Sequence, residues 1–253
     1  MDQRPTSNDR ATRGVAPTSF SPMHLVLFDV DGTLLSAGGA GRRAIHRALI
    51  DVFGSTGPDD YWFDGKTDRQ IVRDLMRSDG HGDESIDARM DAVLSRYVAC
   101  LEHELRRPEH PPRLHTGVAE LVDALDDRTD IVLGLLTGNL EVGARAKLEA
   151  VGVDPSRFAV GAYGSDHESR PDLPAVAQRR AREHLGLDLP GSAVVIIGDT
   201  PADIACGRSV GARAIGVATG RYTVKELSAC GAVAVFQDLS DTTAVVEAIT
   251  SRC

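Results

Sequence analysis

The sequence lacks the features that mark disulfide-rich or zinc-binding proteins, membrane proteins and nucleic-acid-binding proteins. Its four cysteines (Cys100, Cys206, Cys230 and Cys253) show no C-x-x-C spacing, so we expect isolated thiols in a reducing compartment and neither a disulfide framework nor a zinc site. No apolar run approaches the length of a membrane span. Basic residues are not in excess, because the formal net charge is -9, whereas a nucleic-acid-binding protein would carry a basic surface. We therefore predict a cytoplasmic protein that binds neither nucleic acid nor a membrane.

The first segment, residues 1–21, also lacks the apolar core of a signal peptide. It is rich in proline, serine, threonine, asparagine and aspartate, a composition that predicts a disordered tail. The whole chain has 253 residues, which is enough for one core domain with a smaller domain inserted into it.

A short apolar run, Leu25–Phe28, has the pattern of a strand that is buried on both faces of a parallel sheet. Two carboxylates, Asp29 and Asp31, follow it directly, and Gly32 and Thr33 come next. On its own this could be an ordinary Asp-Gly turn. In open α/β sheets, however, chemistry gathers beyond the carboxyl ends of the strands, and two acids there are costly to bury without a cation.

Three further apolar runs end in polar groups of the same kind. The run 131–136 leads to Thr137, Gly138 and Asn139, the run 158–163 leads to a polar loop that contains Arg170, and the run 193–197 leads to Asp199 and Asp203. Singly, a threonine or an Asp-x-x-x-Asp is typical of a helix cap or a helix N-terminus. Together they predict a functional edge on the parallel sheet of a three-layer α/β protein.

A helical stretch separates the first strand from the others. Apolar residues recur at helical spacing over residues 44–53, 71–76 and 90–105, after a glycine-rich stretch at 36–41 that suits a mobile loop. No core strand is apparent in this region. We therefore expect a core domain at residues 22–37 and 114–253, and an all-helical domain inserted at residues 38–113.

These features resemble the haloacid dehalogenase (HAD) superfamily of phosphohydrolases. The resemblance covers residues 25–218 and rests on the motifs at 28–34, at 136–139 and at 198–204, which read FDVDGTL, LTGN and GDTPADI. It implies a Rossmann-like HAD core with a parallel sheet. It also implies that the helical insertion is a type-one cap, as in phosphoglycolate phosphatase and β-phosphoglucomutase relatives.

The resemblance also assigns roles within the first motif and around a metal ion. It implies that Asp29 is the nucleophile that forms an aspartyl-phosphate, and that Asp31 is the general acid and base. A Mg2+ ion, which prefers hard oxygen ligands, would be held by Asp29, the backbone carbonyl of Asp31, Asp199 and Asp203.

Further residues of these motifs are implied to act on the substrate. Thr137, with the amides of Gly138 and Asn139, would hold the phosphate oxygens. Gly32 and Thr33 are also candidates for binding the substrate.

One motif departs from the family pattern. Relatives usually supply a lysine from the loop before the fourth-motif strand, and this chain has only three lysines, none of them in that loop. Arg170 occupies the expected place and could bridge Asp29 and the phosphate as a planar fork. Lys147 is the alternative, but its helical context favours an exposed side chain.

Substrate selection is expected to depend on the loop 64–69, where Lys66 and Arg69 precede or begin a helix and could form an anion site. The structural alternative is a turn in which Asp68 caps that helix. If Lys66 or Arg69 reaches the core, the substrate carries a second negative group. Arg42 and Arg43 are further candidates, although a solvated helix face explains them equally well.

The sequence therefore predicts a Mg2+-dependent phosphatase that acts on a small phosphorylated metabolite, either phosphoglycolate-like or a sugar phosphate, as a monomer or homodimer. One alternative is a phosphomutase of the β-phosphoglucomutase type, which shares these core motifs. Another is a catalytically weak HAD-fold protein with a binding or regulatory role. Dehalogenase chemistry is disfavoured, because it needs neither a metal nor Asp31 as general acid and base.

Overall fold

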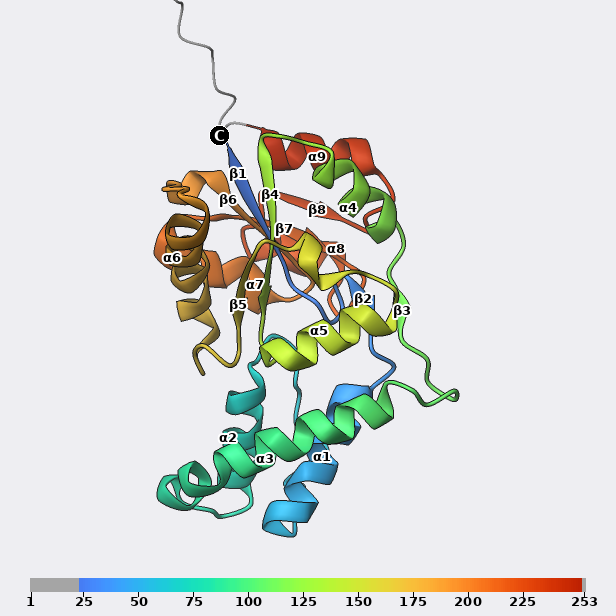
Figure 1. Ribbon diagram of the computed structural model, residues 1–253, viewed down its shortest axis with the longest axis vertical. Coiled ribbons are helices and arrows are strands. Elements are labelled where there is room, and N and C mark those ends of the chain that lie inside the picture. Colours follow the sequence, from blue (N-terminus) through green and yellow to red (C-terminus); the bar gives the residue numbers. More distant parts are fainter. Residues whose placement is uncertain (1–22, 252–253) are drawn as a thin grey trace, which may run out of the picture.

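A computed structural model describes residues 23–251. The tail predicted for residues 1–21 lies outside the described residues. A six-stranded, wholly parallel sheet forms the centre of the molecule, with the strand order β5-β4-β1-β6-β7-β8 (Figure 1). Its strands are β1 (His24–Phe28), β4 (Ile131–Thr137), β5 (Val160–Tyr163), β6 (Val194–Gly198), β7 (Arg213–Val217) and β8 (Ala234–Phe236). The prediction of an α/β protein with a parallel sheet is confirmed.

Helices cover both faces of this sheet. One face packs against α4 (Val118–Asp126), α5 (Glu141–Ala150) and α9 (Thr242–Thr250), and the other against α6 (Leu173–Leu185), α7 (Pro201–Cys206) and α8 (Val224–Ala229). The described part of the chain also has four 3-10 turns, η1 (Pro155–Arg157), η2 (Arg170–Asp172), η3 (Gly191–Ala193) and η4 (Gly207–Val210). The predicted three layers are therefore present.

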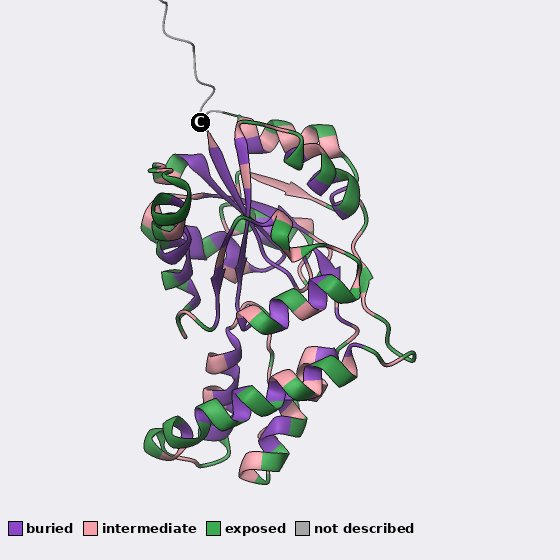
Figure 2. Ribbon diagram, viewed as in Figure 1, coloured by how far each residue is buried: buried purple, intermediate pink, exposed green. Residues whose placement is uncertain are grey.

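The continuous apolar runs of the strands follow from this double covering. In β1, Val26 and Phe28 join the cluster on the α4, α5 and α9 side, whereas Leu25 and Leu27 join the cluster on the α6 side. Each of these side chains is fully buried, so each contributes about 1.5–3 kcal/mol of hydrophobic stabilisation. Figure 2 shows the central strands as the most continuously buried part of the chain.

The strand order determines which loops meet. Strand β1 pairs with β4 on one side and with β6 on the other, and Phe28 is in register with both Leu135 and Ile197. After β5 the chain returns across β1 to begin β6, so the direction of strand addition reverses beside β1. Such a reversal opens a crevice at the carboxyl ends of the strands. Asp29, Thr137 and Asp199 all lie at this edge.

Three helices form a separate group beyond that edge, α1 (Ala40–Phe53), α2 (Asp68–Ser78) and α3 (Asp83–Glu104), seen at the bottom of Figure 1. Helices α1 and α3 pack together through buried residues such as Ile45, Leu49 and Tyr97. The chain enters and leaves this group through two short antiparallel strands, β2 (Leu35–Ser36) and β3 (Arg113–Leu114). Each strand has only two residues, too few for the sequence to show a period.

Helix boundaries correct two expectations in this region. Helix α1 begins at Ala40, inside the stretch predicted as a mobile loop, because Gly38 and Gly39 make the turn with φ of 59° and 79°. Helix α2 is capped by Thr67, whose side chain accepts a hydrogen bond from the Gln70 amide. Asp68 is therefore not the cap. At the start of α8, Thr223 and Glu226 form a capping box.

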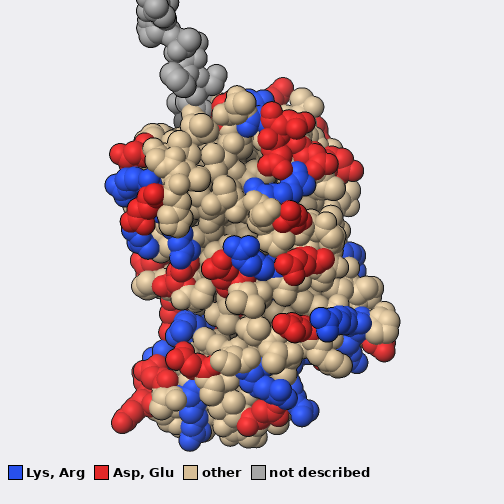
Figure 3. Space-filling view, viewed as in Figure 1, with Lys and Arg blue, Asp and Glu red and all other residues tan. Residues whose placement is uncertain are grey.

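None of the helices within residues 23–251 is both long enough and apolar enough to span a membrane. On the face drawn in Figure 3, basic and acidic side chains are interspersed.

Candidate active site

Three buried carboxylates meet at the crevice. Asp29 follows β1, Asp199 follows β6, and Asp203 lies on the first turn of α7, and one oxygen of each falls within 4.8 Å of the others. Burial, followed by the charge of Asp203, raises the pKa of Asp199 well above its usual range. Burial also raises the pKa of Asp29 to about 6, although Arg170 opposes the rise. Packing three acids so closely is costly unless cations compensate them.

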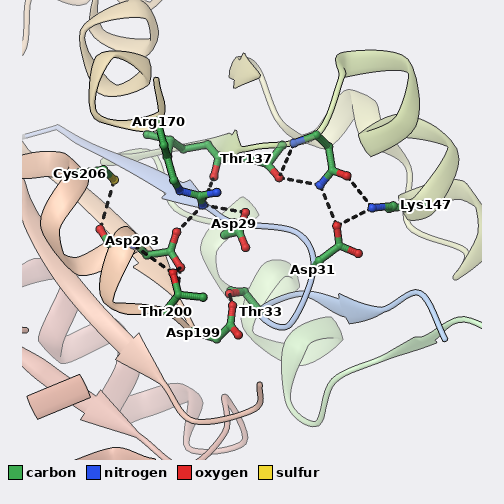
Figure 4. A network of polar contacts seen from close by, with 12 residues as sticks. Asp29, Asp31, Thr33, Thr137, Lys147, Arg170, Asp199, Thr200, Asp203 and Cys206 are labelled. Atoms are coloured by element: carbon green, nitrogen blue, oxygen red, sulfur yellow. Dashed lines mark hydrogen bonds and ion pairs between the residues drawn. The ribbon is translucent and has the colours of Figure 1, made fainter. Parts of the chain in front are cut away.

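Arg170 supplies part of this compensation. Its guanidinium lies 3.0 Å from an Asp29 oxygen and forms a second, shorter ion pair with Asp203 (Figure 4). The side chain is buried, and burial alone would lower its pKa, but Asp203 and Asp29 outweigh that effect and raise it. The Nε atom has no hydrogen-bond partner among the described residues. Arg170 thus bridges two of the three acids and keeps a donor free.

The second oxygen of Asp203 is held by the helix that carries it. It accepts hydrogen bonds from the amide and the hydroxyl of Thr200, at 3.0 Å and 2.7 Å, and the Thr200 hydroxyl in turn accepts from the Asp203 amide. This capping box begins α7, with Pro201 in its first turn. Asp203 is therefore fixed between Arg170 and a helix N-terminus.

Asp199 lies between two glycines that leave no room for a side chain. A Cβ on Gly32, where φ is +84°, would lie 2.4 Å from an Asp199 oxygen, and a Cβ on Gly220 would lie 1.8 Å from it. The Thr33 hydroxyl donates to the other oxygen at 3.2 Å. Gly32 and Thr33 thus position Asp199. The sequence did not predict this role for them.

A second polar cluster surrounds Asp31. Its Oδ2 atom accepts hydrogen bonds from Lys147 at 2.5 Å and from the Asn139 side chain at 2.8 Å. The Asn139 side chain also donates to the Thr137 hydroxyl at 2.8 Å, and its oxygen accepts from Lys147. Figure 4 shows Thr137, Asp31 and Lys147 on one side of Asp29, with Arg170 and Asp203 on the other.

The position of Lys147 corrects the expectation of an exposed lysine. Its side chain is only 3% exposed. The residue lies on α5 seven positions after Leu140, about two helical turns, so it shares the face that packs toward the crevice. The sequence of this short helix does not indicate that its one lysine lies on the buried face.

Hydrogen bonds dock the three-helix group onto the loops after β4 and β5. The Asp68 amide donates to the Gly138 carbonyl, and the Asp68 carboxylate accepts from the Leu140 amide, both at 2.8 Å. The Thr67 hydroxyl donates to the Glu168 carbonyl at 2.7 Å. A Cβ on Gly138 would lie 2.0 Å from the Lys66 carbonyl oxygen, so only glycine permits this approach.

Burial raises the pKa of Asp68 to about 6, although Lys147 and the Leu140 amide oppose the rise. The guanidinium of Arg221 stacks on the exposed ring of Trp62, 3.4 Å from its centroid. This contact also joins the core to the loop before α2.

A cavity of about 380 Å³ lies between the sheet edge and the three helices. Of the residues predicted for the site, its wall includes Asp29, Asp31, Gly32, Lys66, Thr137, Gly138, Asn139, Arg170 and Asp199. Arg69 is not part of this wall, and its guanidinium lies 3.5 Å from Asp91 on the surface. Lys66 contacts the Tyr61 hydroxyl at 2.5 Å. Arg42, named only as a candidate, lines the cavity and stacks on Phe63.

Other lining residues had no signal in the sequence. Tyr97 follows the apolar spacing of α3, Arg113 lies in the two-residue strand β3, and His115 follows that strand. Arg43, the other arginine considered, instead pairs with Glu104 at 2.5 Å.

Comparison with known proteins decides the family. The sequence model of the haloacid dehalogenase-like hydrolase family matches residues 26–208. This range includes the three acids, Arg170 and the polar cluster around Asp31. The chain belongs to the haloacid dehalogenase-like hydrolase family. The prediction of membership in this superfamily is confirmed.

This hydrolase is similar to a phosphatase in sequence and to solved structures in fold. It is 27% identical to a phosphoglycolate phosphatase of Rhodospirillum rubrum over 230 residues, which cover 85% of this chain and 87% of the relative. A hydrolase from Pseudomonas syringae has the same fold, with a TM-score of 0.67, 23% identity, and coverage of 90% and 100%. So does CbbY from Rhodobacter sphaeroides, solved in complex with phosphate, with a TM-score of 0.63, 22% identity, and coverage of 87% and 96%.

The three acids also fit the divalent cation that phosphatases of this family generally use. All of the donors are hard carboxylate oxygens. Three carboxylates facing one guanidinium leave two negative charges in the cluster. A single divalent cation would balance them.

Proposed function

We propose that this hydrolase is a Mg2+-dependent phosphomonoesterase that acts on a small phosphorylated metabolite, either phosphoglycolate-like or a sugar phosphate. One observation carries the proposal. Asp29, paired with Arg170, and Asp31, paired with Lys147, line the same cavity from two positions of one loop that are separated by a single residue. This gives a nucleophile and a separate acid-base group the different surroundings that two-step phosphoryl transfer requires.

Asp29 is proposed as the nucleophile. Its 3.0 Å contact with Arg170 holds one carboxylate oxygen, so the other can face an incoming phosphorus atom. Attack would form a carboxylate–phosphorus bond and break the bond to the leaving oxygen, which gives an aspartyl-phosphate. Arg170 would also neutralise charge on the phosphoryl oxygens, the main demand of this transition state.

Asp31 is proposed as the general acid and base. Its side chain is 42% exposed, and both of its hydrogen bonds are made by one oxygen, so the other oxygen is available to the substrate. It would give a proton to the leaving oxygen in the first step. It would take a proton from the attacking water in the second step.

A bound Mg2+ would shield the negative charge of the phosphoryl group from that of the acids. Asp29, Asp199 and the backbone carbonyl of Asp31 would hold it, with Asp203 orienting a ligand or its water. Thr137 and the amides of Gly138 and Asn139 would hold phosphoryl oxygens. Gly32 and Thr33 would act through the position of Asp199.

The helical group, residues 38–113, is proposed as a cap that encloses the substrate. The lining residues that it contributes, among them Lys66 and Arg42, then select the leaving group. A cavity of about 380 Å³ suits a small metabolite. The similarity to a phosphoglycolate phosphatase supports a substrate of that kind.

The test is phosphate release from p-nitrophenyl phosphate, with Mg2+ and with EDTA, by the wild type, Asp29→Asn and Asp188→Asn. Asp188 is an exposed acid and serves as the control. Release that needs Mg2+ and is lost only in Asp29→Asn supports the proposal. Release that persists in Asp29→Asn excludes Asp29 as nucleophile. Transfer to a hexose phosphate without release would instead indicate a phosphomutase, and no reaction with any phosphate ester would favour a binding role.

A further inference from the structure

Helix α1 begins at the wall of the cavity with an N-terminus that no side chain caps. Its N-cap residue is Gly39, which has no side chain to accept a hydrogen bond from the first turn, and that turn contains no acidic residue. The first turn instead carries Arg42 and Arg43, although cations are unfavourable at this end of a helix dipole. The N–H groups of Gly41 and Arg42 find no acceptor within the described residues, and both residues line the cavity. The start of α1 therefore offers free donors and positive potential to the cavity.

A buried hydroxyl faces the same point. Tyr97, on α3, is fully buried and lines the cavity, and its hydroxyl has no hydrogen-bond partner within residues 23–251. A Cβ on Gly41 would lie 3.9 Å from this hydroxyl and 3.4 Å from the Lys147 ammonium, so the three groups converge. An unpaired buried hydroxyl costs about 1–3 kcal/mol. A ligand atom that accepts its hydrogen bond would remove this cost.

Lys147 adds a positive charge with a donor to spare. An ammonium group has three N–H donors, and Lys147 uses two of them, for Asp31 and for Asn139. Two acids lie near this point. Asp31 pairs with Lys147, and Asp68, which also faces the Tyr97 hydroxyl, accepts a hydrogen bond from the Leu140 amide on one oxygen.

We infer that these groups form a second anion site, in which the amides of Gly41 and Arg42, the Tyr97 hydroxyl and the Lys147 ammonium bind an anionic substituent of the substrate's leaving group. We call this point the inner subsite. The inference rests on the proposed function, and it identifies the substrate class as phosphate esters whose alcohol carries a second anion. It also moves the second-anion site from Arg69, which lies on the surface, to residues on α1, α3 and α5.

The contact between Lys147 and Asp31 limits the length of the leaving group. The proposed acid-base group lies 2.5 Å from the ammonium. The ester oxygen must lie within hydrogen-bond distance of Asp31, and the anion within hydrogen-bond distance of Lys147, about 3 Å in each case. The Asp31 oxygen that is free for the ester lies about 2 Å from the one that contacts Lys147, so no more than about 11 Å can separate the ester oxygen from the anion. A carboxylate on an alcohol of two to four carbons fits this limit.

The test compares two substrates that differ only at the inner subsite. Phosphoglycolate and ethyl phosphate share the ester and the first carbon, and a carboxylate in the former replaces a methyl group in the latter. We expect a ratio of kcat/KM of at least about 100 in favour of phosphoglycolate in the wild type, since each hydrogen bond to a charged group is worth about tenfold or more. Tyr97→Phe should lower this ratio about tenfold, and Lys147→Met about 100-fold. Lys225→Met, which removes an exposed lysine of α8, should leave it unchanged.

The outcomes separate the inner subsite from the proposed function. Hydrolysis of both esters at equal rates, or a ratio that Tyr97→Phe does not change, would overturn the inner subsite and leave the phosphatase standing. If the wild type hydrolyses neither ester, calorimetric titration of the wild type and Tyr97→Phe with phosphoglycolate and ethyl phosphate decides the subsite. The proposed function fails as well if p-nitrophenyl phosphate is not hydrolysed. Tighter binding of phosphoglycolate that Tyr97→Phe weakens supports the subsite, and equal binding refutes it. Tyr97→Phe should fold normally, because it keeps the buried aromatic ring and adds no volume to the core.

Discussion

The ammonium of Lys147 lies 2.5 Å from Oδ2 of Asp31 and links helix α5 to the loop after β1. Arg170 forms the corresponding contact with Asp29 on the other side of that loop. Each acid of the first motif thus has its own cation, and each cation comes from a different segment of the core. The two acids are therefore held in different surroundings although only Val30 separates them.

Replacing Asp31 should affect poor leaving groups most. Asp31→Asn cannot supply a proton, so we expect kcat for ethyl phosphate to fall by about 10²–10⁴-fold. The fall for p-nitrophenyl phosphate should be much smaller, because its phenolate leaves with little protonation. Steady-state kinetics with both esters measure the difference. Equal losses on the two substrates would contradict the acid-base role.

Removing the charge of Arg170 should destabilise the core as well as abolish activity. Arg170→Met leaves Asp29 and Asp203 buried without their common partner, a change that typically costs about 3–5 kcal/mol. Urea denaturation without Mg2+ measures this cost. Arg170→Lys keeps the charge and should retain part of both properties.

The control is Arg182→Met, which removes an exposed arginine whose nearest acid lies 3.8 Å away, and a change of less than about 0.5 kcal/mol is expected there. If Arg170→Met is as stable as the wild type, the ion pairs are not needed to bury the acids.

Asp68 should make stability depend on pH. Burial raises its pKa to about 6 in the folded protein, above the value of about 4 in an unfolded chain. The folded state therefore binds the proton more tightly. The stabilising contribution is full below about pH 4 and is lost as the pH rises through about 6.

Relative to the wild type, Asp68→Asn should become more stable as the pH rises from about 4 to about 7. Urea titrations of both proteins at matched pH values, in EDTA, measure the difference. A difference that is constant with pH would show that Asp68 is not the titrating group.

A methyl group on Gly220 should disturb the metal site. In Gly220→Ala the new Cβ would lie 1.8 Å from an Asp199 oxygen, so the carboxylate must move away from Asp29 and Asp203. We expect the rise in Tm on adding Mg2+, which a folded-state ligand produces by mass action, to shrink or disappear. Gly82→Ala is the matched control, because its Cβ would meet no atom within 4 Å. An unchanged Mg2+ shift in Gly220→Ala would argue against Asp199 as a ligand.

The fold could be predicted because its signals are local. Buried parallel strands give continuous apolar runs, and the polar groups that end them appear next to them in the chain, as Asp29 does after Phe28. Strand pairing then brings these ends together without further information.

Much of the site is not local. Tyr97 reads as one more apolar position of α3, and the face on which Lys147 lies depends on how α5 packs. The inner subsite joins α1, α3 and α5, and no spacing within the sequence marks such a meeting of three helices.

The docking of Asp68 onto the loop after β4 has a consequence for turnover. Moving the three helices away from the sheet must break the bonds of Asp68 to the Gly138 carbonyl and the Leu140 amide. Gly138 and its neighbours are also the groups proposed to hold the phosphoryl oxygens. Opening the cavity and weakening the binding of the product are thus coupled. Release of inorganic phosphate would therefore limit the rate of turnover, and kcat would fall as solvent viscosity rises.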